Sequence, residues 1–196
     1  MQNKNLLRGV GLALLCLCSG CALIAKWSYG IRNPKPVSTD FIIKQAQKKG
    51  WDTERLLFLS EKAWAPFFEQ GTSFPQVFVY DHAGQLLFKR PAGAACAKGF
   101  PGFLRALKQK DKAWNPPAKG QPVLFNGLPE LKSQDGQTFR WSPTHNYVIF
   151  SFWAHFAGKM SKWVDSVEQI SRHSTPLSAL HFMVNCDPID NHKRRP

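Results

Sequence analysis

The chain has 196 residues, of which 43% are hydrophobic and 13% aromatic, which suits one packed domain and excludes an intrinsically disordered chain. The formal net charge is +13 at pH 7. Such a positive field favours anionic partners, such as lipid headgroups, cell-wall polymers, acidic proteins or nucleic acid, although a merely basic surface also accounts for it.

The first 20 residues have the three parts of an export signal. Lys4 and Arg8 form a short basic start, and residues 10–17 form an apolar run that is too short to span a bilayer. The segment 17–21 (LCSGC) resembles the lipobox of bacterial lipoproteins, with Cys18 where Leu is usual. The resemblance implies that residues 1–20 are a signal peptide and that Cys21 is lipidated with diacylglycerol and palmitate. An ordinary secretory leader and an uncleaved anchor are the alternatives.

The residue after Cys21 is Ala22 rather than Asp. By resemblance to the enterobacterial sorting pattern, this favours the outer membrane, with the body of the protein facing the periplasm. Once the leader is removed and Cys21 is lipidated, the remaining thiols are those of Cys96 and Cys186. In an oxidising compartment these two are either free thiols or a structural disulfide.

The elements between the anchor and residue 108 follow from hydrophobic pattern and turn residues. Residues 21–37 read as a tether, because Gly30, Pro34 and Pro36 interrupt regular structure. Ser38 or Thr39 can cap a helix over residues 40–49. The pattern then predicts a strand over 55–60, a helix over 63–70, a hairpin of strands 76–80 and 85–89 around the turn 81–84, and a helix over 100–108.

A linker over residues 109–122 divides the body of the chain, because it is charged and contains Pro116 and Pro117. Beyond it the pattern predicts a hairpin over 130–141, a buried central strand over 147–153 (YVIFSFW), a helix with an apolar stripe over 160–170, a strand over 177–184 and a basic tail over 191–196. Strands that alternate with helices predict an α/β fold with a central sheet.

Residues 150–160 (FSFWAHFAGKM) resemble the active-site turn of thioredoxin-like proteins, where a buried strand ends in Phe-Trp-Ala and Cys-Gly-x-Cys opens a helix. A thiolate at a helix N-terminus is stabilised by the helix dipole and by free backbone N–H groups. Here Trp153 and Gly158 keep the frame, but Ala157 occupies the nucleophile position and Met160 the resolving position. The resemblance therefore implies a degenerate active-site turn without a dithiol.

Two further segments support this resemblance. Residues 183–187 (MVNCD) are similar to a strand end of periplasmic redoxins, and residues 128–137 resemble their N-terminal hairpin. Pro75, before the strand 76–80, takes the place of the family's cis-proline, which faces the active-site turn.

The order of these matches implies a circular permutation. Residues 38–108 correspond to the C-terminal half of a thioredoxin-like fold and residues 123–190 to its N-terminal half, joined by the linker. Permutation is compatible with folding because domain termini often lie close together at the surface. The alternatives are an unrelated α/β domain, and halves that pair between two chains in a swapped dimer.

A redoxin-like body without its dithiol predicts a protein that is not an enzyme. We expect a structural or interaction subunit of a cell-envelope assembly, with a type IV secretion or conjugation apparatus as one setting by analogy. The expected partners are the membrane, through the lipid anchor, envelope proteins and a second copy of the chain, but not nucleic acid. Trp27, Trp64 and Trp114 are candidate interface anchors, although tryptophan is also common in aromatic cores.

Two other functions remain open at this point. One is a residual thiol–disulfide oxidoreductase or redox sensor that uses Cys96 or Cys186. The other is a chaperone-like binder that uses the groove beside Pro75. No cofactor or metal is expected, because the histidines share no metal-ligand spacing (His145, His155, His173 and His181).

Overall fold

The computed structural model describes residues 30–69, 76–91, 99–110, 125–141, 144–173 and 179–190. The predicted signal peptide, Cys21, Pro75, Cys96, most of the linker and the basic tail lie outside the described residues. Backbone alone is described for 108–110, for Met160 and for 171–173.

A six-stranded mixed sheet forms the centre of the fold, and it confirms the predicted α/β class. The strand order is β3-β2-β5-β6-β1-β4. Strands β1, β6 and β5 are parallel neighbours, whereas β2, β3 and β4 each pair antiparallel with the strand beside them. The strands are β1 (Leu56–Leu59), β2 (Gln76–Asp81), β3 (Leu86–Lys89), β4 (Leu131–Lys132), β5 (Tyr147–Trp153) and β6 (Ala179–Asn185).

The sheet interleaves the two parts of the chain that flank the linker. Strands β1, β2 and β3 come from the first part, and β4, β5 and β6 come from the second. The two parts meet at three strand pairs. Asp81 lies opposite Tyr147 in the β2–β5 pair, Leu57 lies opposite Val184 in the β1–β6 pair, and Leu59 lies opposite Leu131 in the β1–β4 pair. Both parts are therefore needed to complete this sheet, and the circular permutation itself stays a prediction.

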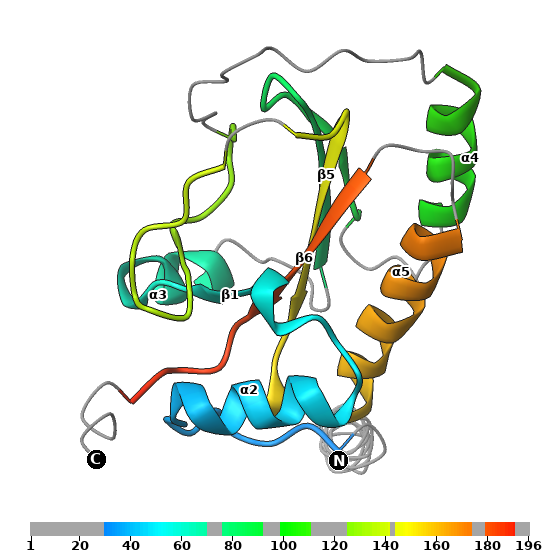
Figure 1. The fold of residues 1–196 in the computed structure, drawn as a ribbon. Coiled ribbons are helices and arrows are strands. Elements are labelled where there is room, and N and C mark those ends of the chain that lie inside the picture. Colours follow the sequence, from blue (N-terminus) through cyan, green and yellow to red (C-terminus); the bar gives the residue numbers. More distant parts are fainter. Residues whose placement is uncertain are drawn as a thin grey trace, which may run out of the picture.

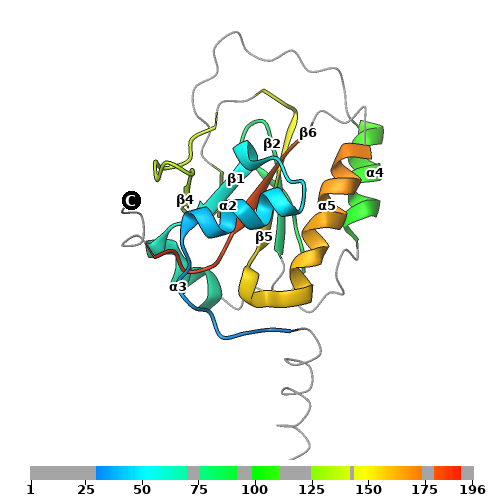
Figure 2. The ribbon, with the colours of Figure 1, turned by 60° about the horizontal axis from the view of Figure 1, so that its bottom comes forward.

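Helices cover the two faces of the sheet unequally (Figures 1 and 2). Helices α2 (Thr39–Lys48), α4 (Phe100–Lys110) and α5 (Lys162–His173) pack on one face, and α3 (Glu61–Glu69) packs on the other beside the segment 125–141. Alternation along β1 explains the division, because Leu56 and Phe58 contact the α2 side whereas Leu57 and Leu59 contact the α3 side. The central strand β5 is buried from Val148 to Trp153, as its continuous apolar run predicts.

Local signals set several element boundaries. Ser38 is the N-cap of α2, and its side chain accepts a hydrogen bond from the Phe41 backbone N–H at 3.2 Å. Gly84 closes the β2–β3 turn with a φ of 80°, a conformation that glycine adopts without strain. The predicted helix 63–70 lies at 61–69, and the predicted strand 177–184 is described from 179 to 185.

The hairpin expected over 130–141 forms, but its paired part is short: β4 has two residues, and Lys132 is bridged antiparallel to Thr138 across the turn. One prediction of local structure was wrong in part. The helix expected to start near Met160 begins at Lys162, after a 3₁₀ segment, η2 (His155–Ser161). Gly158 interrupts η2 with φ 57° and ψ −128°, which is outside the helical region.

Candidate functional site

The turn after β5 is held by the neighbouring strand β6 rather than left open. The Cys186 backbone N–H donates to the Trp153 carbonyl at 2.7 Å, and the Ser161 hydroxyl donates to the Ala154 carbonyl. Ala157, at the predicted nucleophile position, is 2% exposed. Its methyl group therefore packs inside the turn, where it offers no reactive group to the surface.

Asp187, just after β6, places a carboxylate at the backbone of this turn. The carboxylate accepts hydrogen bonds from the N–H of His155 at 2.6 Å and of Phe156 at 3.2 Å. A third bond comes from the Asn185 side-chain amide at 2.8 Å. Burial raises the pKa of Asp187, although its three hydrogen bonds act in the opposite direction. Sequence reasoning gave Asp187 no role, because its two backbone partners lie more than 30 residues away along the chain.

The turn therefore already contains an anion of the protein's own. The backbone partners of this carboxylate are the N–H groups of the two residues before Ala157, and α5 begins five residues beyond Ala157. The turn therefore offers no nucleophile at position 157, and the N–H groups of residues 155 and 156 are already bound.

The described thiol, Cys186, is in an environment that keeps it protonated. The side chain is fully buried, and burial raises its pKa well above the ordinary value, with the neighbouring charge of Asp187 acting in the same direction. Reactive cysteines have a lowered pKa and partial exposure. Cys96 lies outside the described residues, and strands β2 and β5 separate β3, which precedes it, from β6.

Residues 31–37, predicted as part of a tether, pack on the same end of the sheet; we call them the strap. The Arg32 N–H donates to the Phe156 carbonyl at 2.7 Å. The Val37 N–H donates to the Pro188 carbonyl, and the Asp190 N–H donates to the Val37 carbonyl, each at 2.9 Å. These bonds fix the strap against the turn 155–161 and the segment after β6.

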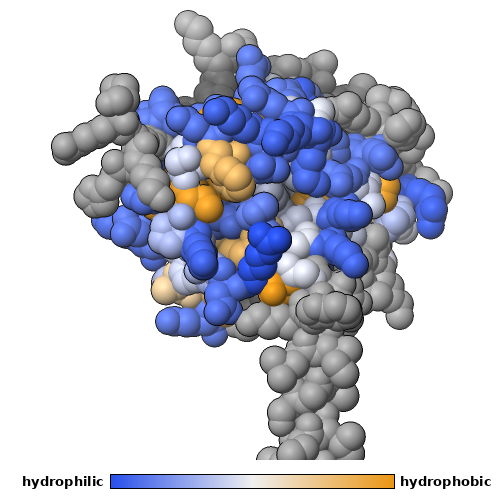
Figure 3. Space-filling view, turned by 90° about the horizontal axis from the view of Figure 1, so that it is seen from below, coloured by the Kyte–Doolittle hydropathy of each residue, from blue (hydrophilic) through white to orange (hydrophobic). Residues whose placement is uncertain are grey.

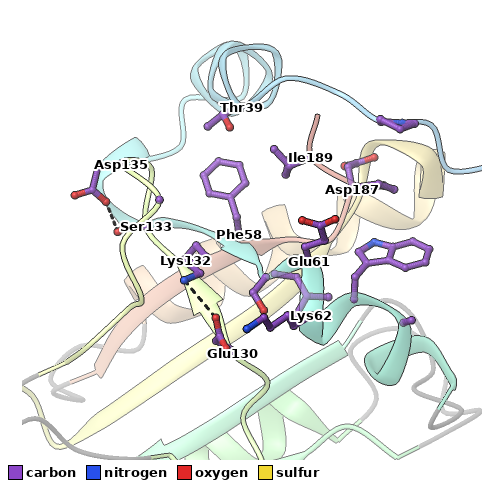
Figure 4. Close-up of a pocket in the computed structure, with 17 residues that line it drawn as sticks. Thr39, Phe58, Glu61, Lys62, Glu130, Lys132, Ser133, Asp135, Asp187 and Ile189 are labelled. Atoms are coloured by element: carbon purple, nitrogen blue, oxygen red, sulfur yellow. Dashed lines mark hydrogen bonds and ion pairs between the residues drawn. The ribbon is translucent and has the colours of Figure 1, made fainter. Parts of the chain in front are cut away.

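A pocket of about 730 Å³ opens at the carboxyl ends of β1 and β6 (Figure 4). Ligands of open α/β sheets bind beyond the carboxyl ends of the strands. The strap, α3, the β4 turn and the segment after β6 all contribute walls. The lining residues include Pro36, Thr39, Phe58, Ser60, Glu61, Lys62, Trp64, Ala65, Glu130, Lys132, Asp135, Asp187 and Ile189.

The side chains of this pocket are partly fixed and partly free. Lys132 forms an ion pair with Glu130 at 3.3 Å, and Ser133 donates to Asp135. The Trp64 indole N–H donates to the Cys186 carbonyl at 2.9 Å, which holds the ring in place. Glu61 and Lys62, in the first turn of α3, are exposed and form no ion pair with another described residue. The pocket therefore combines a fixed aromatic wall with one free carboxylate and one free ammonium group.

Three polar side chains, from β5, β6 and α5, contact one another in the core on the face of the sheet that α5 covers. Ser151 on β5 contacts the His181 Nε2 atom, and His181 Nδ1 contacts the Glu168 carboxylate. The three residues are 0%, 3% and 8% exposed, respectively. A nucleophilic serine must be accessible to its substrate, and Ser151 is fully buried. We therefore assign the contacts among Ser151, His181 and Glu168 to structure rather than to catalysis. Sequence reasoning missed them because they depend on the register of β5 against β6.

The other predicted site residues contribute little to the site. His155 is exposed and contacts the Phe41 ring edge-on at 5.1 Å, and His145 lies apart on the loop before β5. Among the described residues, no group of three or more His, Cys, Asp or Glu is placed to hold a metal ion. None of the helices in the described ranges is long and apolar enough to cross a membrane.

Comparison with protein-family models, with curated proteins and with solved structures finds no match for this chain.

Proposed function

We propose that this chain is a non-catalytic, thioredoxin-like lipoprotein that acts as an interaction subunit of a cell-envelope assembly. In this proposal, Cys21 carries the lipid and holds the body on the periplasmic side of the outer membrane. A type IV secretion or conjugation apparatus is one such assembly.

The observation that carries the proposal is the Asp187 carboxylate within the turn 155–161. It accepts the His155 and Phe156 N–H groups at 2.6 and 3.2 Å, and Ala157 is buried beside it. In this proposal the turn has lost the means of thiol chemistry, because Ala157 supplies no nucleophile, and the Asp187 hydrogen bonds hold the turn in one conformation. Function then depends on what the surface binds.

The pocket between the strap and α3 is the surface best suited to a partner. Interface anchors are usually aromatic side chains in preformed pockets, surrounded by polar groups. Trp64 is held in place by its bond to Cys186, and Glu61 and Lys62 beside it are free to pair with a partner. We therefore place the protein contact at this pocket.

Site-specific photocrosslinking in membranes tests this proposal. A photoreactive side chain at Ala65, which is exposed and lines the pocket, should give a discrete adduct with another envelope protein. The same group at Gln85, an exposed position in the β2–β3 turn, is the matched control.

The adduct at Ala65 should disappear when Glu61→Lys and Lys62→Glu are introduced together, because the carboxylate and the ammonium group then exchange positions and no longer match the partner. The net charge of the protein is unchanged in this double variant. Recovery of the uncrosslinked chain alone at both positions, or the same adducts at both, would contradict the proposal.

A further inference from the structure

Positive charge is concentrated in two segments of the described chain. Residues 30–50 and 155–165 hold seven basic and two acidic residues, a formal charge of +5. The remaining described residues hold ten basic and ten acidic residues, so their formal charge is zero. All seven basic residues of the two segments are exposed: Arg32, Lys35, Lys44, Lys48, Lys49, Lys159 and Lys162.

The two segments form one continuous surface, which we call the strap face. Arg32 binds Phe156 through the backbone, Phe41 contacts His155, and the Lys49 ammonium lies 3.2 Å from the Asp165 carboxylate. Figure 1 shows the strap, α2 and the end of β5 along the same side of the protein. Figure 3 views the protein from that side, and the surface is mostly hydrophilic, with separate hydrophobic spots.

Only a short segment of the chain separates the strap face from the predicted anchor at Cys21. Gly30 follows Cys21 by nine residues, and a fully extended chain of that length spans at most roughly 30 Å. The strap then continues from Gly30 onto the turn 155–161. A lipid on Cys21 would therefore bring the membrane within reach of the strap face without fixing which face of the body meets it.

We propose that the strap face lies against anionic phospholipid headgroups and orients the body on the membrane. This inference rests on the anchor of the proposed function, but it predicts a preferred orientation that the anchor alone does not require. Each basic side chain near an anionic surface strengthens partitioning by roughly fivefold. Because the attraction falls off over about 8 Å at physiological salt, basic residues on the strap face contribute and those at the opposite end do not.

A probe at the opposite end of the sheet serves as the reference for a probe on the strap face. Strand β5 runs from Tyr147, beside Asp81 and the β2–β3 turn, to Trp153, beside the strap face. Gln47 on α2 and Gln85 in the β2–β3 turn are both exposed, so the same fluorescent side chain at either position reports on opposite ends.

The experiment uses the full-length chain bound to vesicles of phosphatidylcholine with phosphatidylglycerol, at excess lipid, with a nitroxide quencher on the headgroups. Quenching at position 47 should exceed quenching at position 85, because a headgroup nitroxide quenches only fluorophores that lie close to the membrane surface. The triple variant K44Q/K48Q/K162Q should bring the ratio close to one. The matched variant K89Q/R105Q/R140Q removes three exposed charges from other elements and should leave the ratio unchanged.

The possible outcomes separate this inference from the anchor. Equal quenching at the two positions, an equal effect of both triple variants, or no binding of the chain to anionic vesicles would each overturn the proposed orientation. Retention on pure phosphatidylcholine vesicles reports the anchor instead, and it should be lost in Cys21→Ala. If the chain were not retained on pure phosphatidylcholine vesicles but the quenching ratio on anionic vesicles were preserved, the lipoprotein assignment would be refuted. The proposed orientation of the strap face would then stand.

Discussion

Asp187→Asn tests the buried carboxylate that binds the turn 155–161. The carboxylate is 2% exposed, and it binds the N–H groups of His155 and Phe156 and the side chain of Asn185. Burial raises its pKa above the ordinary value of 3.8. The folded state therefore binds the proton more tightly than the unfolded state does.

The sign of the resulting pH dependence follows from this difference. The contribution of Asp187 to the free energy of unfolding is fully present below the unfolded pKa and is lost as the pH rises through the folded pKa. A difference of one between the two pKa values corresponds to about 1.4 kcal/mol. In the variant this contribution is absent, and the amide nitrogen leaves one backbone N–H without an acceptor, at a cost of about 1–3 kcal/mol.

Asp187→Asn should therefore destabilise the protein most near the unfolded pKa and less as the pH rises. Urea denaturation of both proteins, in steps from about pH 4 to about pH 8, measures the difference across this window. Asp40→Asn, at an exposed position in the first turn of α2, is the control, and its effect should not change in the same way. A cost of Asp187→Asn that is equal at every pH, or that grows with pH, would refute the reasoning.

Three other variants or probes test the core, the helix cap and the thiol. Phe150→Ala removes a fully buried ring of the central strand and should cost about 3–5 kcal/mol in urea denaturation, whereas Leu86→Ala, at a side chain that is 37% exposed, should cost less than about 1 kcal/mol. Ser38→Ala removes the N-cap of α2 and should cost about 1 kcal/mol in thermal unfolding; an unchanged melting temperature would show that the cap is dispensable. Cys186 should react with a thiol reagent only after denaturation, as followed by mass spectrometry of its peptide, because its thiol is buried and protonated; rapid labelling of the native protein would return it to the candidates for redox chemistry.

Local patterns predicted most of the sheet and its helices. The run Tyr147–Trp153 is apolar throughout, and it forms the buried central strand β5. Ser38 caps α2, and Gly84 closes the β2–β3 turn, because each supplies a local conformation or bond that its neighbours in sequence require. These features depend on residues within a few positions of one another.

The content of the candidate site was less predictable, because it depends on tertiary contacts. Asp187 gains its role only when β6 lies beside β5 and brings it to the N–H groups of residues 155 and 156. The contacts among Ser151, His181 and Glu168 need the same register and the packing of α5. The strap contains two prolines of the predicted tether, but its backbone bonds to Phe156 and Pro188 are long-range.

Concentration of charge on one face was also beyond the sequence alone. The net charge of +13 indicated a basic surface without locating it. Only the contact of the strap and α2 with the turn 155–161 shows that seven exposed basic residues share one side. The anchor motif and the strap face thus point to the same end of the protein from independent observations.

Mass spectrometry of the N-terminal peptide of the protein extracted from membranes tests the central claim most directly. The lipoprotein assignment predicts a peptide that begins at Cys21 and carries diacylglycerol on its sulfur and a fatty acid on its amine, with no such species in Cys21→Ala. An unmodified Cys21 in the mature protein would contradict it.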